Sequence, residues 1–207
     1  CMDNDKIRRG KPSAHVKFGE ASAVLAGNSL LTLAFEIIAD KNYSINPRLK
    51  IEIIKSLAFC SGHTGIAGGQ ELDLKFEKKK KNFKQIINMQ KKKTGKLFNF
   101  CFYAVAVMAK KNVKDKAILS NLGEEIGLLF QFADDFLDIK GSKKLVGKLI
   151  KKDNEKGKST LINLMGYEKA YNYANNLKRN ILLKLKKHGK NTRDLKNTIE
   201  FILGRNF

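Results

Sequence analysis

The amino-acid sequence predicts an all-α protein whose 207 residues form a single domain, residues 1–207. Apolar residues recur at three- and four-residue spacing along most of the chain, which is the period of a helix with one buried face. No stretch shows the sustained alternation of apolar and polar residues that is typical of a half-buried strand. Only two prolines interrupt the pattern, and hydrophobic residues make up 43% of the chain, which is enough for a substantial core.

The helical pattern divides into segments that are separated by polar or glycine-containing breaks. Pro47 stands where proline favours the first turn of a helix. Residues 139–158 are polar and lack clean periodicity, so we expect a loop there. The predicted helices are 19–39, 47–58, 83–89, 96–110, 114–138, 159–165, 167–188 and 191–204, with a break at residues 93–95.

Two residue types that often build functional sites are arranged here without the spacing that such sites need. Three cysteines and three histidines show no metal-ligand spacing, so we expect reduced thiols and no zinc site. A group of glycines between the second and third predicted helices does not match a phosphate-binding loop. We expect these glycines to allow close helix packing or a kink; they are Gly62, Gly65, Gly68 and Gly69.

The chain carries a formal net charge of +21, from 41 Lys and Arg residues against 20 Asp and Glu residues. Such a surplus is typical of proteins that bind nucleic acid. However, the basic residues are almost all lysine and are spread along the chain, whereas base readout favours arginine. We therefore interpret most of them, including Lys78 to Lys81, as solvated surface and expect no nucleic-acid partner. The uncharged run from Leu97 to Ala109 is shorter than the roughly 20 residues of a membrane span, so we expect a cytoplasmic protein without stable membrane insertion.

The most informative motif is QFADDFLDIKG, residues 131–141, which places three aspartates in an otherwise apolar helix. Asp134 and Asp138 are four residues apart and share a helix face, and Asp135 lies roughly 100° round the axis. Carboxylates this close repel one another unless a cation neutralises them, and Mg²⁺ is bound in this way by carboxylates, water and substrate phosphates. The motif predicts a magnesium site, with a solvated acidic helix end as the alternative.

A second acidic group, Asp3 and Asp5, opens the chain and is followed at once by Arg8 and Arg9. Acidic residues beside a pair of arginines are typical of a metal–phosphate site, although a short solvated loop has the same composition. Three lysines stand next to residues that favour anion binding: Lys93 before Thr94, Lys148 after Gly147, and Lys158 before Ser159. Each alone is best interpreted as surface, and it is their combination with two acidic groups that favours a metal–phosphate site.

Taken in order, these motifs resemble the trans-isoprenyl diphosphate synthases, and most closely the bacterial farnesyl diphosphate synthases. The matching segments are MDND..RRGKPSAH, FGEASAVLAG, HTGIAGGQELDL, KTGKLF, QFADDFLDIKG and GKLIKKD followed by GKST, which span essentially the whole chain. The resemblance implies a terpenoid-synthase-type helical bundle around a central cavity, usually a homodimer. It also implies that the leading helices of the family, with the first two aspartates of its first Asp-rich motif, are missing from this chain. We therefore expect the chain to be the C-terminal part of a longer synthase.

In this family an allylic diphosphate ionises to a carbocation and pyrophosphate, the double bond of isopentenyl diphosphate attacks the cation, and a proton is lost. The resemblance implies that several Mg²⁺ ions on the allylic diphosphate are held by Asp3, Asp134, Asp135 and Asp138. For the substrates it implies that Arg8, Lys93 and Lys148 bind the allylic diphosphate, that Lys158 closes over it, that Arg9 binds isopentenyl diphosphate, and that Thr94 and Gln131 line the cation region.

The expected reaction joins isopentenyl diphosphate to dimethylallyl or geranyl diphosphate, with farnesyl diphosphate as the expected product. A geranylgeranyl or longer-chain synthase is the alternative, because the residues that set product length in the family lie upstream of Asp3. Two alternatives come from other classes of protein: a non-catalytic partner subunit, which the intact aspartate set at residues 134–138 disfavours, and a Lys-rich helical RNA-binding protein.

Overall fold

The computed structural model describes residues 1–204 except residues 3, 9, 78 and 146–159. The chain divides into two compact units, residues 1–54 and residues 55–207, and each is described by itself. Helices make up nearly all of the regular structure in the described residues, as the sequence predicts. The expectation of a single domain stays a prediction.

Unit 1 begins with a small hairpin that the sequence pattern did not predict. Strands β1 (Ile7–Arg8) and β2 (Lys11–Pro12) pair in antiparallel fashion. Gly10, at the turn, has a φ of +73°, a left-handed conformation that glycine adopts without strain. Two residues per strand are too few to produce a visible alternation. Two helices, α1 (Ala14–Phe18) and α2 (Glu20–Ala39), follow; α2 matches the predicted helix at 19–39, whereas the short α1 before Gly19 was not predicted.

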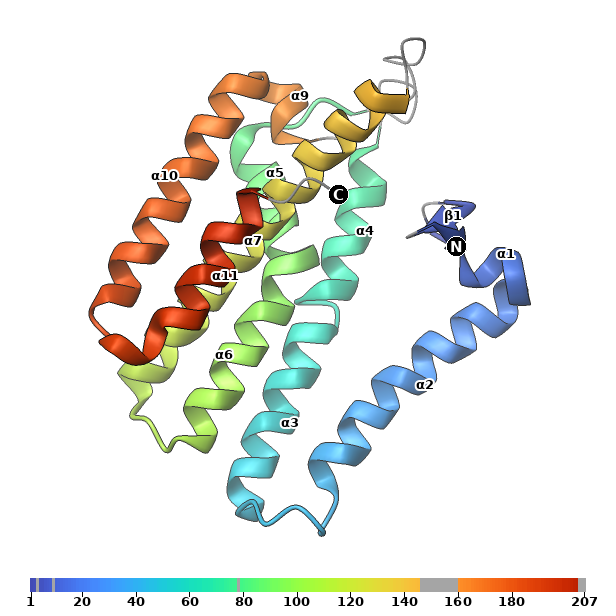
Figure 1. The fold of residues 1–207 in the computed structure, drawn as a ribbon. Helices are drawn as coiled ribbons and strands as arrows, with labels where there is room; N and C mark the ends of the chain where they lie inside the picture. Colours follow the sequence, from blue (N-terminus) through green and yellow to red (C-terminus); the bar gives the residue numbers. More distant parts are fainter. Residues whose placement is uncertain (3, 9, 78, 146–159, 205–207) are drawn as a thin grey trace. The chain divides into compact units, whose positions relative to one another are not determined.

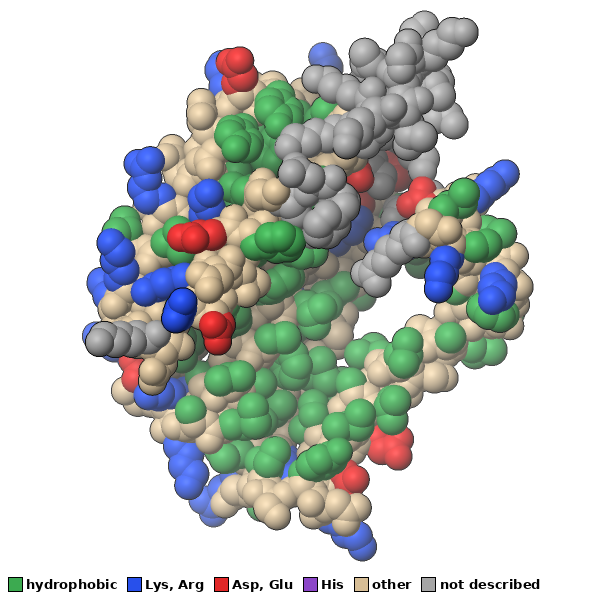
Figure 2. All heavy atoms as spheres, viewed as in Figure 1, with side chains coloured by type: hydrophobic (Ala, Val, Ile, Leu, Met, Phe, Trp, Pro, Cys, Tyr) green, Lys and Arg blue, Asp and Glu red, His purple; other side chains and the backbone are tan. Residues whose placement is uncertain are grey.

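Helix α2 is apolar but has no buried residue in the structure. Hydrophobic side chains line it in Figure 2. Its most apolar window has a mean hydropathy of 1.6, so among the described helices it alone is long and apolar enough to cross a membrane. The shorter run at Leu97–Ala109 was therefore the wrong segment on which to judge membrane insertion. Length and composition are weak evidence for a span, because core helices of soluble proteins meet the same criteria.

Unit 2 is a helical bundle built around α7 (Val113–Leu145), which has 33 residues. Helix α7 packs against α6 (Lys96–Met108), α10 (Tyr167–Lys186) and α11 (Arg193–Gly204), which lie alongside it in Figure 1. The side chains of Leu129 and Phe132 are fully buried at the centre of this core. Helix α7 continues to Leu145, so the predicted loop at residues 139–158 was wrong for its first seven residues.

Shorter elements complete the bundle: α3 (Pro47–Ser61), whose C-terminal part belongs to unit 2, α4 (Ile66–Phe76), α5 (Phe83–Gln90), the π-helix η1 (Lys91–Gly95), α9 (Leu161–Met165) and the 3₁₀ turn η2 (Lys190–Thr192). A capping box formed by Asn82 and Gln85 begins α5, and the Thr160 hydroxyl caps α9. The three cysteines are free, in agreement with the expectation of reduced thiols.

Glycines allow the close helix contacts in unit 2, as the sequence indicated for the group at residues 62–69. Gly69, on α4, packs against η1, because a Cβ atom on it would lie 2.2 Å from the backbone nitrogen of Lys93. The same holds between α7 and η1, because a Cβ on Gly127 would lie 2.7 Å from the Cα of Gly95. No side chain larger than hydrogen fits at these positions without a shift of the backbone.

Candidate active site

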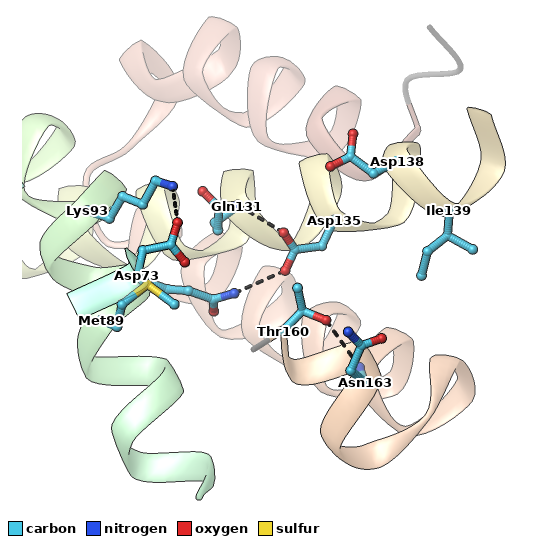
Figure 3. Close-up of a pocket in the computed structure, with 10 residues that line it drawn as sticks. Asp73, Met89, Lys93, Gln131, Asp135, Asp138, Ile139, Thr160 and Asn163 are labelled. Carbon is cyan, nitrogen blue, oxygen red and sulfur yellow. Dashed lines mark hydrogen bonds and ion pairs between the residues drawn. The ribbon is translucent and has the colours of Figure 1, made fainter. Parts of the chain in front are cut away.

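A cavity of about 100 Å³ lies in unit 2 among α4, α5, η1, α7 and the start of α9 (Figure 3). It brings together residues from distant parts of the sequence, and most of them are polar. The lining residues are Asp73, Met89, Gln90, Lys93, Gln131, Asp135, Asp138, Ile139, Thr160 and Asn163. Four of these were singled out from the sequence, namely Lys93, Gln131, Asp135 and Asp138.

Lys93 reaches the cavity because it lies in the π-helix η1, where the sequence predicted a break. A π-turn widens the helix and changes the direction of its side chains, and such turns are frequent at functional sites. Helix α4 supports this turn closely: a Cβ on Gly69 would lie 2.2 Å from the backbone nitrogen of Lys93. One turn further along α4, Asp73 accepts a hydrogen bond from Lys93 Nζ at 2.5 Å (Figure 3). Helix α4 therefore holds both the backbone and the charged end of Lys93.

A chain of side-chain hydrogen bonds joins η1, α5 and α7 around Asp135. Gln131 Nε2 donates to Asp135 Oδ1 at 2.9 Å, and Gln90 Nε2 donates to Asp135 Oδ2 at 3.0 Å. Thr94 Oγ1 donates to Gln131 Oε1 at 2.7 Å, which fixes the orientation of the Gln131 amide. Each oxygen of the Asp135 carboxylate is thus held by a neutral amide donor, and Thr94 contacts Gln131; their role in lining the cation region stays a prediction.

The electrostatic surroundings of Asp135 favour the binding of a cation. Burial is the largest cause that raises the pKa of Asp135, to about 7; the hydrogen bond from Gln131 opposes it, and the neighbouring charges of Asp138, Asp134 and Asp73 each raise the pKa by less. A positive charge placed nearby would stabilise the ionised carboxylate and lower this pKa.

The donor atoms at the cavity fit a hard cation such as Mg²⁺. Two carboxylates, Asp135 and Asp138, line it together with amide and hydroxyl oxygens. Mg²⁺ usually takes one or two protein carboxylates and completes its shell with water and substrate phosphates. Within the described part of the chain no group of three or more His, Cys, Asp and Glu side chains is placed to hold a metal. The arrangement therefore fits an ion that is shared with a phosphorylated substrate, and the metal roles of Asp134, Asp135 and Asp138 stay predictions.

Several residues singled out from the sequence are placed elsewhere. Asp134 is half-buried on α7 next to the network and is not among the lining residues of the cavity. Arg8 is exposed on β1 in unit 1. The others lie outside the described residues; they are Asp3, Arg9, Lys148 and Lys158.

Sequence reasoning missed two residues that contact the predicted ones directly. Asp73 pairs with Lys93, and Gln90 holds Asp135. A signal for Asp73 was present in its spacing from Gly69. The two residues are four apart and share a helix face, and a glycine on that face indicates that another helix packs closely there. Gln90 carried no such signal, since an amide in a Lys- and Asn-rich segment is unremarkable until its partner 45 residues away is known.

Comparisons with known proteins agree with this geometry. The family model described as polyprenyl synthetase matches residues 1–202. Farnesyl diphosphate synthase of Escherichia coli is 39% identical over 211 residues, which cover 100% of this chain and 71% of the relative. Geranylgeranyl and geranylfarnesyl diphosphate synthases also match, at 36% and 37% identity. The chain spans between 57% and 71% of the length of the first curated relatives.

Solved structures give the same result. An FPP/GFPP synthase from Zymomonas mobilis, in its apo form, superposes with a TM-score of 0.84 at 37% identity, covering 98% of this chain and 68% of the other. A geranyltransferase from Helicobacter pylori, complexed with magnesium and isoprenyl diphosphate, superposes with a TM-score of 0.78 at 29% identity, covering 98% and 66%. The resemblance inferred from the motifs is confirmed, and the chain belongs to the polyprenyl synthetase family.

Proposed function

We propose that the protein carrying this chain is a magnesium-dependent trans-prenyltransferase. It joins isopentenyl diphosphate to dimethylallyl or geranyl diphosphate and makes farnesyl diphosphate. The single observation that carries the proposal is the cavity of unit 2, where Lys93 from η1 meets Gln131, Asp135 and Asp138 from α7. Relatives of this chain are farnesyl, geranylgeranyl and geranylfarnesyl diphosphate synthases, so the product proposed has its nearest alternative in a longer chain.

The residues at the cavity have the chemistry that loss of a diphosphate requires. Mg²⁺, when bound, would neutralise the charge that develops on the departing pyrophosphate. Asp135 and Asp138 would hold the ion, with Asp134 beside them, and Lys93 would exchange its contact with Asp73 for the diphosphate oxygens. No catalytic base is needed to start such a reaction, since ionisation depends on stabilising the leaving group.

The hydrogen-bond chain would serve the carbon end of the allylic substrate. Thr94 and Gln131 present oxygen atoms whose partial negative charge favours a nearby carbocation. Because the Gln131 amide is fixed at both ends, by Thr94 and by Asp135, its dipole is oriented before the substrate arrives.

The remaining residues of the proposal rest on the family resemblance. Asp3 would add a metal ligand, and Arg8 and Lys148 would bind the allylic diphosphate. Arg9 would bind isopentenyl diphosphate, and Lys158 would close over the site. A homodimer in the cytoplasm is the expected form of the protein.

Sizing the products tests the function. The protein is incubated with Mg²⁺, labelled isopentenyl diphosphate and, in parallel, dimethylallyl, geranyl or farnesyl diphosphate, with a chelator of divalent metals as the control. We expect a fifteen-carbon alcohol after dephosphorylation, formed only without chelator. Products of twenty carbons or more would replace the farnesyl assignment by the longer-chain one. No product from any primer would contradict the prenyltransferase proposal.

A further inference from the structure

Gln90 occupies an unusual position for an amide side chain. It is the last residue of α5 and is only 3% exposed, yet it lines the cavity. Its Nε2 donates to Asp135 Oδ2 at 3.0 Å, in a hydrogen bond between two buried side chains. Its Oε1 is buried and has no hydrogen-bond partner. The amide nitrogen thus has a partner, and the amide oxygen has none.

The unsatisfied oxygen shows what determines the orientation of the side chain. A buried acceptor without a donor destabilises the folded state, and native structures rarely keep one without a functional reason. Rotating the amide by half a turn would direct Oε1 at the Asp135 carboxylate, where two acceptors would repel each other. The observed orientation is therefore the one that holds an ionised Asp135, even though it leaves Oε1 unsatisfied.

Packing alone does not require an amide at this position. The neighbouring Met89 is also buried, at 3% exposure, and belongs to the hydrophobic core of unit 2. An unbranched apolar side chain such as methionine would fill the space of Gln90 without leaving a polar atom unsatisfied. The feature of Gln90 that methionine lacks is the donor to Asp135.

We propose that Gln90 is a positioning residue that fixes the Asp135 carboxylate for binding of magnesium diphosphate. The proposal rests on the function proposed above. Gln90 acts through Asp135: it holds Oδ2, while Gln131 holds Oδ1, so that the carboxylate cannot rotate away from the cavity. Gln131 also accepts a hydrogen bond from Thr94. The fixed carboxylate therefore also holds the side chains of Gln131 and Thr94 in place.

The test measures binding of inorganic pyrophosphate in the presence of Mg²⁺ by isothermal titration calorimetry. Gln90→Met removes the donor and keeps the length of the side chain, and we expect affinity to fall by about tenfold or more, as for loss of a hydrogen bond to a charged group. Asn88→Met is the matched control, because Asn88 is an exposed amide on the same helix. The affinity of this variant for pyrophosphate is expected to equal that of the wild type. The Mg²⁺ concentration for half-maximal prenyl transfer is expected to rise in parallel for Gln90→Met alone.

A double-mutant cycle shows whether Gln90 acts through Asp135. In an Asp135→Asn background, Gln90→Met is expected to cause little further loss of affinity, because its partner is already altered. Equal losses in both backgrounds would mean that Gln90 acts independently of Asp135, and the proposal would be wrong. If Gln90→Met does not fold, Gln90→Asn replaces it in the test. This variant keeps the amide but is one methylene shorter, and the same loss of affinity for pyrophosphate is expected.

The outcomes separate this proposal from the proposed function. If the wild type binds magnesium pyrophosphate and makes product, but Gln90→Met and Asn88→Met both match it, only the role of Gln90 is overturned. If the wild type neither binds magnesium pyrophosphate nor makes product, the function is overturned, and the role of Gln90 falls with it.

Discussion

Helix α7 carries two sets of carboxylates that are held by different kinds of partner. In its middle, Glu124 pairs with Lys96 at 2.6 Å and with Lys91 at 3.3 Å, and Glu125 pairs with Lys184 at 2.5 Å. About three turns later, Asp135 is held by the neutral amides of Gln90 and Gln131. The two sets lie on one helix in one unit, so the difference comes from their neighbours.

The choice of partner decides what each carboxylate can do. A lysine neutralises the charge of Glu124 or Glu125 and so makes the pair part of the scaffold. An amide orients the carboxylate of Asp135 and leaves its negative charge available for a ligand cation. In the proposed function, neutral donors, burial and neighbouring aspartates together distinguish the cation-binding carboxylate of Asp135 from the lysine-paired glutamates.

The largest effect is expected on turnover, when an aspartate of the group at residues 134–138 is replaced. Asp134→Ala should lower turnover by about a hundredfold or more, because it removes charge from a site that works by electrostatics. Far-ultraviolet circular dichroism should show little loss of helix. Glu125→Ala is the matched control in the lysine-paired set, with turnover near that of the wild type and a loss of stability of about 0–1 kcal/mol. Unchanged kinetics of Asp134→Ala would contradict the proposed role of that residue.

An added methyl group at a tightly packed glycine tests the helix packing between the two sets of carboxylates on α7. Gly127→Ala should lower the free energy of unfolding by about 1–3 kcal/mol, because its Cβ would lie 2.7 Å from Gly95 Cα and 2.9 Å from Phe98 Cδ2. Urea denaturation measures the change. Gly27→Ala has nothing within 4 Å of the added atom and should be neutral or slightly stabilising. Equal stabilities of the two variants would show that the α7–η1 contact is looser than described.

A third effect is expected in the pH dependence of stability, and it sharpens the comparison. The pKa of Asp135 is raised to about 7 in the folded protein from an ordinary value of 3.8. The folded state therefore binds more protons than the unfolded state between these values, and stability falls as pH rises from about 4 to 7. Asp135→Asn should flatten this fall in metal-free buffer, because asparagine does not bind or release a proton in this pH range. Melting temperatures at pH 5 and pH 8, with a chelator present, measure the difference. Parallel pH profiles would exclude Asp135 as their source.

The smallest effect is expected on the exposed lysines. Replacing Lys79, Lys80 and Lys81 by glutamine should leave turnover unchanged, because we interpret the run as solvated surface. Lys81 lies 4.7 Å from the centre of the Phe76 ring, so a slight loss of stability, of about 0.5–1 kcal/mol, is expected from this substitution. A large fall in activity would show that the run takes part in substrate binding.

Local patterns in the sequence predicted most of the fold. Three- and four-residue periodicity located the main helices, because amphipathic packing leaves a local signal. The same patterns did not show that α7 continues to Leu145 or that η1 is a π-helix, because Gly141 and Gly95, with the polar residues beside them, indicated breaks where the backbone stays helical. The hairpin at Ile7–Pro12 is too short to have a pattern of its own.

The sequence by itself determined the all-α class, the family and four lining residues of the cavity, because helix periodicity and the order of short motifs are properties of neighbouring residues. Only the tertiary structure decided that Asp73 holds Lys93 and that Gln90 holds Asp135. It alone also placed Asp135 rather than Asp134 at the cavity. These contacts join different helices, and whether a carboxylate meets a lysine or an amide depends on how those helices pack, which no local pattern records.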